Sequence, residues 1–443
     1  MRLEQFRGDR VAVLGFGREG QSAWRLLKQR ADLQALEVWC ESGALPTEVS
    51  GRVAEFDQGL AAYDVVLRSP GVPVDHPALR EYRRQGGRIV NPSSIFLSER
   101  PELPVIGVTG SKGKSTTASL LAHLLRAESD SVVLAGNIGL PLLDQLDTTA
   151  SLVVAELSSY QLADLEGRLR LGIITRLFPE HLDWHGSVEA YYAVKLRLAE
   201  LLDGQPLIIN GRDPVLKLAT SAVPGRIESN RAPFFNRRED ELMLDQAPLL
   251  RSRDLRLVGR HNLDNAALAL EAACLLGRPL MPLLDALRSF QALEHRLETV
   301  STAGERRWIN DSIATSPHAT LAALESAEGH PVVLLVGGQD RPSDWAPVAQ
   351  WCQRRPLRGL VVLPDNGDRV ARALEAAGAV EAAKIRKAED LDAAIAAAVQ
   401  LSRAGDTILL SPGAPSFPRF RNFEARGLQF REAIQRYLDR STA

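Results

Sequence analysis

Short apolar runs separated by amphipathic stretches recur along the chain and predict strands that alternate with helices. The runs are rich in Val, Ile and Leu and lie at 10–14, 64–67, 105–109, 132–135, 152–156, 332–336, 359–363 and 406–410. Helical spacing of apolar residues follows several of them, for example at 117–125 and 390–402. Continuous apolar strands that alternate with helices are typical of parallel sheets, so we expect an α/β protein.

The chain is long enough for several domains. Its 443 residues correspond to roughly two to four domains. The candidate motifs fall into three segments, which predicts domains at 1–98, 99–296 and 297–443. A stretch at 98–104 that contains Glu and Pro has the composition of a linker between the first two.

The strongest chemical pattern is a glycine-rich turn between the run at 105–109 and a helix. Its residues are Gly110, Ser111, Lys112, Gly113, Lys114, Ser115 and Thr116. Such a turn surrounds a phosphate with backbone N–H groups and the positive end of a helix dipole. Lys114 would reach the terminal phosphates and the Ser115 hydroxyl would bind Mg²⁺. A strict Walker pattern has glycine at the position of Val108, but the core is complete. The sequence therefore predicts an ATP site rather than an ordinary strand–helix turn.

A second glycine-rich turn follows the first apolar run. Gly15, Gly17 and Gly20 form the pattern G-x-G-x-x-G between a strand and a helix. A further turn at 69–73, which contains Ser69 and Gly71, follows another strand and is expected to face a ligand. From the residues alone, the glycine pattern fits NAD, another nucleotide diphosphate or no ligand.

Further candidates for chemistry lie in the second segment. Glu156 ends an apolar strand, where a carboxylate beside a phosphate loop usually helps to bind Mg²⁺. Lys195 lies on an apolar helix face, from which a lysine usually turns outward to water. If its amine is buried instead, its pKa falls and it can add CO₂ to become a carbamate, an anionic Mg²⁺ ligand. His181 and His185 have the spacing of zinc ligands, but no third ligand is in view.

Polar clusters in the third segment lie in loops after its apolar runs, at 310–315, 337–341 and 411–423. In open α/β sheets, loops at the carboxyl ends of strands form the ligand crevice. We therefore expect a binding site there.

Composition excludes several classes of function. The 53 Lys and Arg residues are balanced by 55 Asp and Glu residues, so no basic excess favours a nucleic-acid partner. Cys40, Cys274 and Cys352 form no disulfide framework, which favours a reducing compartment. No apolar run approaches the roughly 18 residues of a membrane span, and the first residues do not resemble a signal segment. We expect a cytoplasmic protein without membrane insertion.

Together these motifs resemble the Mur ligases over the whole chain. These enzymes use ATP to add amino acids to peptidoglycan precursors, and the chain is most similar to the branch that adds glutamate to UDP-N-acetylmuramoyl-L-alanine. The matching motifs are Gly107–Thr116, Gly136–Gly139, Glu156–Leu162, His181–Asp183, Lys195, Gly259–Asn262, His295–Glu298, Trp308–Ser312 and Leu409–Pro412.

The resemblance implies a role for each segment. It implies a Rossmann-like UDP-binding domain at 1–98, a central P-loop ATP-binding domain at 99–296 and a Rossmann-like, glutamate-binding domain at 297–443. It assigns the first glycine turn to UDP rather than NAD. The implied substrate contacts are Gly15, Gly17, Ser69, Gly71, Asn137, Ser158 and Gln161. The implied nucleotide contacts beyond the phosphate loop are Asn265, Arg296 and Asp311. The implied glutamate site is Thr315, Arg341, Ser416 and Phe423.

The resemblance also implies a mechanism. The substrate carboxylate attacks the γ-phosphate of ATP to give an acyl phosphate, and the amine of glutamate then displaces phosphate. The catalytic residues would be Lys114, Glu156, His181 and Lys195. Two Mg²⁺ ions are implied, one at Ser115 and Glu156 and the other at His181 and carbamylated Lys195. We expect a monomer.

Departures from the family pattern lie mainly in the predicted glutamate site, with one in the phosphate loop. Ile313 stands where related enzymes have lysine, and Arg341 is offered where they supply lysine to the incoming glutamate. Lys112 replaces an asparagine of the phosphate loop. Because an arginine fork binds a carboxylate differently from a lysine, we expect L-glutamate to be the substrate, with an epimerase acting afterwards.

Alternatives remain open. The first is the same ligase with D-glutamate as its substrate. A folylpolyglutamate-synthetase-like ligase would not need the first domain. An NAD-dependent oxidoreductase and a non-catalytic ATP-binding switch belong to other classes of protein.

Overall fold

The computed structural model describes residues 1–41, 45–127, 131–231, 234–257, 259–291, 294–327, 329–340 and 343–442. The chain folds into two compact units. The first contains Met1–Arg251 and Leu263–Arg288, and the second contains Ser252–Asn262 and Ser289–Ala443. No described helix combines the length and the apolar character needed to cross a membrane. The predicted α/β class is confirmed, whereas the domain boundaries at 98 and 296 stay predictions.

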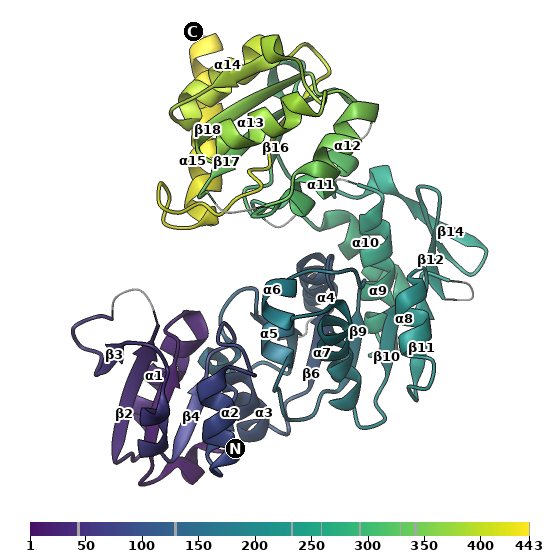
Figure 1. Cartoon of the computed structure of the whole chain (residues 1–443). Coiled ribbons are helices and arrows are strands. Elements are labelled where there is room, and N and C mark those ends of the chain that lie inside the picture. The colour runs from purple at the N-terminus through teal and green to yellow at the C-terminus, as the bar shows by residue number, and fades with distance from the viewer. Residues whose placement is uncertain are drawn as a thin grey trace. The chain divides into compact units, whose positions relative to one another are not determined.

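The first predicted segment forms a parallel sheet with the strand order β3-β2-β1-β4-β5. Its strands are β1 (Arg10–Leu14), β2 (Ala35–Cys40), β3 (Gly51–Val53), β4 (Val65–Arg68) and β5 (Arg88–Val90). Its helices are α1 (Arg18–Arg30), α2 (Pro77–Arg84) and α3 (Pro92–Glu99), with the short 3₁₀ turns η1 (Leu3–Phe6) and η2 (Gln58–Ala62) (Figure 1). Val11 and Val13 pack beneath α1 and α3, while Ala12 and Leu14 pack beneath α2. Alternate residues of β1 are thus buried on opposite faces, as the apolar run predicts.

A second parallel sheet in the same unit has the order β11-β10-β9-β6-β8-β7. Its strands are β6 (Val105–Thr109), β7 (Val132–Gly136), β8 (Leu152–Glu156), β9 (Leu171–Ile174), β10 (Leu207–Asn210) and β11 (Arg226–Ser229). Its helices are α4 (Lys114–Ala127), α5 (Ser159–Leu162), α6 (Leu182–His185), α7 (Val188–Glu200), α8 (Pro214–Ala219), α9 (His261–Leu275) and α10 (Leu280–Ser289). The 3₁₀ turn η3 (Leu142–Gln145) packs against α1 and α3, so one apolar cluster continues from the first sheet to the second.

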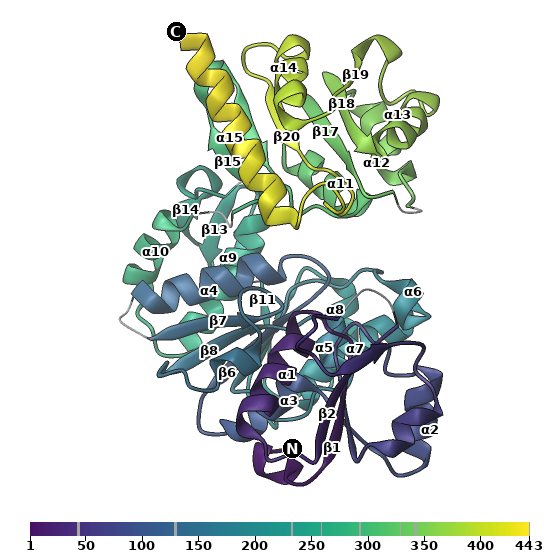
Figure 2. The same ribbon diagram turned by 90° about the vertical axis from the view of Figure 1, so that its left-hand side faces the viewer.

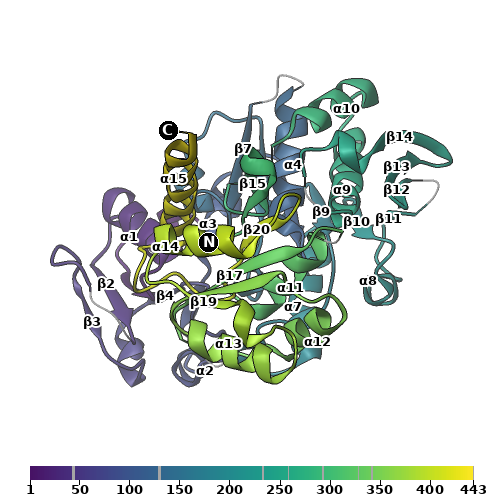
Figure 3. The ribbon, with the colours of Figure 1, turned by 90° about the horizontal axis from the view of Figure 1, so that it is seen from above.

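A small antiparallel sheet lies beside α9 (Figure 3). Its strands are β12 (Phe235–Arg238), β13 (Glu241–Leu244) and β14 (Ala247–Arg251). The backbone N–H of Phe235 donates to Glu271 of α9. Arg237 pairs with Asp264 of the same helix at 2.8 Å. These contacts fix the sheet to the helix that also contains Asn265.

The second unit contains a mixed sheet with the order β15-β16-β20-β17-β18-β19. Its strands are β15 (Glu298–Ser301), β16 (Arg307–Asn310), β17 (Val332–Gly338), β18 (Gly359–Asp365), β19 (Ile385–Lys387) and β20 (Thr407–Leu410), and only β15 is antiparallel to its neighbour. One face is covered by α11 (Pro317–Ser326), α12 (Ala346–Arg354) and α13 (Gly367–Ala376). The other face is covered by α14 (Leu391–Leu401) and α15 (Phe423–Thr442), the long yellow helix of Figure 2. The predicted strands and the helix at 390–402 are confirmed.

We predict that Gly20→Ala strongly destabilises the first sheet. A Cβ at Gly20 would lie 2.1 Å from the carbonyl oxygen of Gly15 and 2.7 Å from Ser69 Oγ, so the backbone would have to move. Overpacking of this kind costs at least about 2 kcal/mol of unfolding free energy. Gly17→Ala is the matched control, because a Cβ there meets nothing within 4 Å. Denaturant unfolding measures both variants, and equal stabilities would contradict the prediction.

Candidate active site

The phosphate loop joins β6 to α4 and requires glycine at two positions. Gly110 has φ +138° and Gly113 has φ +91°, values that side chains rarely adopt. A Cβ at Gly110 would also lie 2.1 Å from Thr175 Oγ1. The Thr175 hydroxyl donates to the carbonyl oxygen of Lys112 at 2.6 Å, so the residue that follows β9 supports the loop. The loop and the first turn of α4 thus have a backbone that fits an anion, and phosphate binding there stays a prediction.

The polar side chains of the loop have different roles. Lys114 Nζ donates to the carbonyl oxygens of Gly110 and Ser111, at 2.8 Å each, so the amine lies over the loop. The Ser111 hydroxyl is buried and accepts from the hydroxyl of Tyr191 at 3.0 Å, so it anchors the loop to α7. Lys112 Nζ forms a 2.9 Å ion pair with Glu180. Ser115 lies with the adjacent Thr116 in the buried first turn of α4.

Glu156 ends β8, beside the strand that leads to the loop. Its side chain is buried, and Oε1 accepts a hydrogen bond from Asn137 Nδ2 at 2.7 Å. Oε2 is also buried and has no hydrogen-bond partner among the described residues. A buried carboxylate oxygen without a partner costs free energy unless a cation or a donor meets it. Glu156 therefore fits a divalent cation such as Mg²⁺, for which oxygen ligands are preferred.

Lys195 of α7 is buried rather than turned outward to water. Desolvation, reinforced by the charge of Lys114, lowers the pKa of its amine well below the usual value, whereas Glu180 and Glu156 oppose the shift. The amine also lies 5.0 Å from the centre of the Tyr191 ring. A lowered pKa populates the neutral amine, which is the form that adds CO₂.

His181 lies in the left-handed region with φ +54°, immediately before α6. Its ring is 5.1 Å from that of Tyr160, which also stacks on His185. His185 Nε2 lies 3.0 Å from Ser159 Oγ. Within the described ranges, no three His, Cys, Asp or Glu side chains form a group that could bind a metal, so the zinc alternative finds no third ligand there.

The glycine turn of the first sheet lines a pocket of about 250 Å³. Its wall contains Gly15, Gly17, Arg18, Glu19, Ser69, Pro70, Gly71, Val72, Gly136 and Pro141. The pocket lies at the carboxyl ends of β1 and β4, where the strand order reverses and where open α/β sheets bind ligands. Ser69 Oγ donates to the carbonyl oxygen of Gly15 at 2.8 Å. The fold therefore brings together the four predicted residues of the first segment.

Arg18 and Glu19 were not predicted as site residues, although they lie inside the glycine pattern. Arg18 donates to the carbonyl oxygens of Asn137 (2.8 Å) and Gly139 (3.2 Å). Glu19 Oε1 accepts from Gln161 Nε2 at 2.6 Å, and desolvation raises the pKa of Glu19 to about 7. Both positions are variable in the glycine motif. The only sequence signal for their contacts is that two charged residues are adjacent.

Ser158 and Gln161 belong to the N-terminal cap of α5. The Ser158 hydroxyl accepts from the backbone N–H of Gln161 at 3.2 Å, and Gln161 Oε1 accepts from the backbone N–H of Ser158 at 2.8 Å. This capping box and Glu19 together fix the orientation of the Gln161 amide. The two predicted substrate contacts are thus rigidly placed.

The predicted nucleotide contacts fall in both units. In the first unit, a Cβ at Gly113 would lie 2.5 Å from Asn265 Oδ1, which places that amide against the phosphate loop. In the second unit, Asp311 accepts from the backbone N–H of Leu297 at 3.2 Å and from the Ser411 hydroxyl at 2.9 Å. Arg296 Nε, in the same unit, is buried and has no hydrogen-bond partner within the part of the chain that the structure describes.

The predicted glutamate site follows neighbouring strands of the second unit. Thr315 comes after β16 and Ser416 after β20, while the loop after β17 meets the β20 loop where Gln339 donates to the carbonyl oxygen of Pro415 at 2.9 Å. Phe423 begins α15. Arg341 lies outside the described residues.

Arg426 connects two loops of the predicted glutamate site, and the sequence did not reveal it. It is fully buried and donates to both oxygens of Ser312 and to the carbonyl oxygen of Ala414. It therefore joins the loops after β16 and β20. One arginine in an amphipathic helix is an ordinary pattern, so nothing in the sequence distinguishes it.

Comparison with known proteins extends these observations. The Mur ligase middle domain matches residues 108–273, and the Mur ligase glutamate ligase domain matches residues 295–413. A UDP-N-acetylmuramoyl-L-alanine–L-glutamate ligase of Micromonospora sp. is 41% identical over 98% of this chain and 98% of that protein. Ligases of the same name are 37% identical in Salinispora tropica, over 98% of this chain and 99% of that one, and 38% identical in Xanthomonas campestris pv. campestris, over 97% and 96%.

Solved structures at lower identity share the fold. UDP-N-acetylmuramate–alanine ligase from Thermotoga maritima has a TM-score of 0.59 at 20% identity and covers 97% of this chain and 100% of its own. Folylpolyglutamate synthase from Mycobacterium tuberculosis, complexed with ADP, has a TM-score of 0.60 at 15% identity, over 76% of this chain and 92% of its own. The motifs, the family domains and the relatives above 30% identity over nearly the whole chain agree: the chain belongs to the Mur ligase family.

Proposed function

We propose that the chain is an ATP-dependent ligase that adds L-glutamate to UDP-N-acetylmuramoyl-L-alanine and releases ADP and phosphate. The observation that supports this most directly is the cluster of Lys114, Glu156 and Lys195 around the phosphate loop. A carboxylate is a poor acylating group, so it must be activated before it can form an amide. A phosphate site that adjoins substrate contacts can supply that activation.

The proposed first step transfers the γ-phosphoryl group of ATP to the terminal carboxylate of the substrate. Lys114 would stabilise the charge that develops on the transferring group, and the loop N–H groups would orient the phosphates. The amine of glutamate would then attack the acyl phosphate and displace phosphate. Asn137, Ser158 and Gln161 would position the acceptor for the first step. Asn137 contacts Glu156, and Gln161 contacts Glu19 in the wall of the first-sheet pocket.

We propose that two magnesium ions bind around the loop. Ser115 and Glu156 would bind one ion, and the buried Oε2 of Glu156, which no described residue meets with a hydrogen bond, supports this assignment. His181 and a carbamylated Lys195 would bind the other. Bound magnesium would supply positive charge that offsets the charge on the phosphoryl oxygens. Burial of the Lys195 amine supports carbamylation, because a buried ammonium ion is costly and a carbamate can be neutralised by the metal.

The choice of L-glutamate rests on the relatives and on the altered loops. The three relatives described above are named as L-glutamate ligases. Thr315, Ser416 and Phe423 would contact the glutamate, together with Arg341. If L-glutamate is added, an epimerase must act afterwards to give the D-configuration, and we propose that both steps take place in the cytoplasm.

We predict phosphate release from ATP and Mg²⁺ with UDP-N-acetylmuramoyl-L-alanine and L-glutamate, and little release with D-glutamate. The enantiomers direct three groups differently, so a pocket built for one rejects the other by at least about 10-fold in kcat/KM. Turnover with D-glutamate alone would overturn the stereochemical assignment. No phosphate release with either enantiomer would overturn the assignment of UDP-N-acetylmuramoyl-L-alanine as the acceptor. Phosphate release with a folate acceptor would favour the folylpolyglutamate alternative.

We predict that Glu156→Gln lowers kcat by at least about 100-fold and raises the Mg²⁺ concentration needed for half-maximal activity. The amide keeps the size of the side chain but loses the negative charge that would bind the cation. A magnesium titration of turnover measures both effects. Glu166→Gln, at an exposed side chain, is the control and should behave as the wild type. An unchanged magnesium requirement in Glu156→Gln would contradict the assignment.

We predict that Lys195→Arg loses nearly all activity although it keeps a positive charge. A guanidinium does not form the carbamate, so the second metal site would be lost. ¹³C NMR after incubation with labelled bicarbonate should show a carbamate signal in the wild type that is absent from Lys195→Arg. A variant with full activity, or a wild type without the signal, would refute carbamylation at this position.

A further inference from the structure

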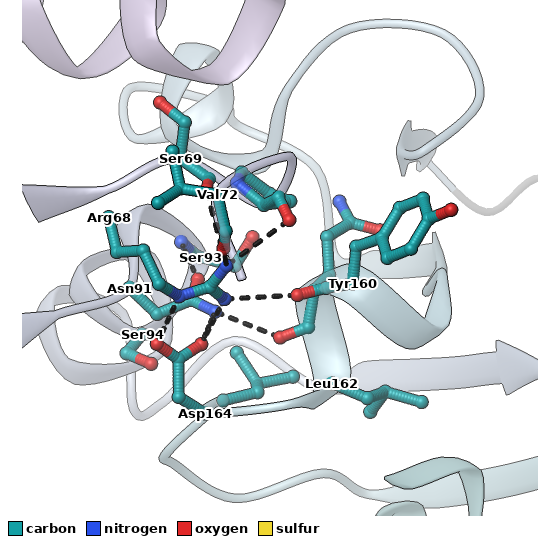
Figure 4. Close-up of polar contacts among 12 residues, drawn as sticks. Arg68, Ser69, Val72, Asn91, Ser93, Ser94, Tyr160, Leu162 and Asp164 are labelled. Carbon is teal, nitrogen blue, oxygen red and sulfur yellow. Dashed lines mark hydrogen bonds and ion pairs between the residues drawn. The ribbon is translucent and has the colours of Figure 1, made fainter. Parts of the chain in front are cut away.

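A fully buried guanidinium lies between the first sheet and α5 (Figure 4). Arg68 is the last residue of β4, and none of its surface is exposed. Arginine is almost never buried without partners, because removing its charge from water costs several kcal/mol. The hydrogen bonds of Arg68 therefore indicate why the charge is tolerated here.

One side of the guanidinium holds the turn that lines the pocket. Nη1 donates to the carbonyl oxygens of Val72 (2.6 Å), Ser69 (3.2 Å) and Pro70 (3.2 Å). All three residues line the pocket. Three carbonyl groups that converge on one donor would repel each other without it, so the conformation of this turn depends on Arg68.

The other side of the guanidinium meets α5 and the residue two positions after it. Nε and Nη2 donate to the two carboxylate oxygens of Asp164 at 2.6 Å and 2.5 Å, a bidentate pair. Nη2 also donates to the carbonyl oxygen of Tyr160 at 3.0 Å. Asn91 adds bonds from Nδ2 to the carbonyl oxygen of Gln161 (2.8 Å) and to Asp164 (2.7 Å). Arg68 and Asn91 thus bind the carboxylate of Asp164 and two carbonyl groups of α5, those of Tyr160 and Gln161.

The position of α5 matters because it bears two proposed substrate contacts. Ser158 caps its first turn and Gln161 reaches Glu19 in the pocket wall. A helix of one turn has little stability of its own, so tertiary contacts decide where it lies. Arg68 and Asp164 supply such contacts directly.

We propose that Arg68 and Asp164 form a positioning pair for the nucleotide-sugar substrate. The pair fixes the Ser69–Val72 turn, at the nucleotide end of the proposed site, relative to α5, at its muramoyl-alanine end. The inference rests on the proposed function, because only a substrate that spans both contacts depends on their spacing. Neither side chain is assigned a contact with the substrate, so both act through the turn and α5.

The test compares the binding of two ligands to the full chain. Isothermal titration measures the dissociation constants of UDP-N-acetylmuramoyl-L-alanine and of ADP with Mg²⁺ for the wild type, Arg68→Lys and Asp164→Asn. Lysine keeps the charge of Arg68 but loses the planar fork. We expect nucleotide-sugar binding to weaken at least about 10-fold and ADP binding to change less than about 2-fold.

A matched control is present on the surface of the same unit. Arg30 and Asp147 also pair across the first and second segments, but their side chains are 41% and 74% exposed and neither lines the pocket. Arg30→Lys should leave both dissociation constants unchanged. Asp164→Asn keeps the shape of a side chain that is 20% exposed, so it tests the proposal even if Arg68→Lys does not fold.

The possible outcomes distinguish failure of the positioning role from failure of the proposed function. Equal weakening of both ligands, or unchanged nucleotide-sugar binding in folded variants, would assign the pair a structural role and overturn the inference alone. A wild type that binds ADP but no nucleotide sugar would overturn the proposed substrate and the inference with it. Selective loss of nucleotide-sugar binding, with normal Arg30→Lys, would support the positioning role.

Discussion

Desolvation of charged groups at the carboxyl edge of the second sheet constrains the rest of the site. Lys114, Glu156 and Lys195 lie close enough for their charges to interact, and the last two are buried. Charges removed from water must be paired, neutralised or met by a ligand. The pKa of Lys195 is lowered, and one oxygen of Glu156 has no hydrogen-bond partner in the described ranges. We infer that a bound phosphate group and a divalent cation supply the charges that balance those of these residues.

In each of these sheets, the candidate site residues follow the carboxyl ends of adjacent strands. In the first sheet the glycine turn and the Ser69 turn follow the adjacent strands β1 and β4. In the second, the phosphate loop and Glu156 follow the adjacent strands β6 and β8. In the second unit, the loops after β16, β20 and β17 follow three neighbouring strands. Parallel pairing collects residues that are distant in sequence at one edge, which is why chemistry concentrates there.

The first two sheets are joined by apolar packing and by directed polar contacts. The apolar cluster that both sheets share stabilises their packing, but apolar contacts impose little directional preference. Arg18, Glu19 and Arg68 add hydrogen bonds whose geometry permits few relative positions. The polar contacts therefore set the register of the two halves of the pocket, while the apolar cluster stabilises it.

Local sequence patterns were enough to predict the α/β class, the phosphate loop, the first glycine turn and the loops of the second unit. These features depend on local rules: apolar runs form buried strands, and tight turns at positive φ need glycine. Only the folded chain shows that Lys195 is buried rather than turned toward water. It also shows that Glu19 contacts Gln161 and that Arg68 contacts Asp164. Arg68 and Asp164 are 96 positions apart, and Glu19 and Gln161 are 142 apart. No local pattern encodes such pairs, because their energy depends on burial and on neighbours that only the folded chain brings together.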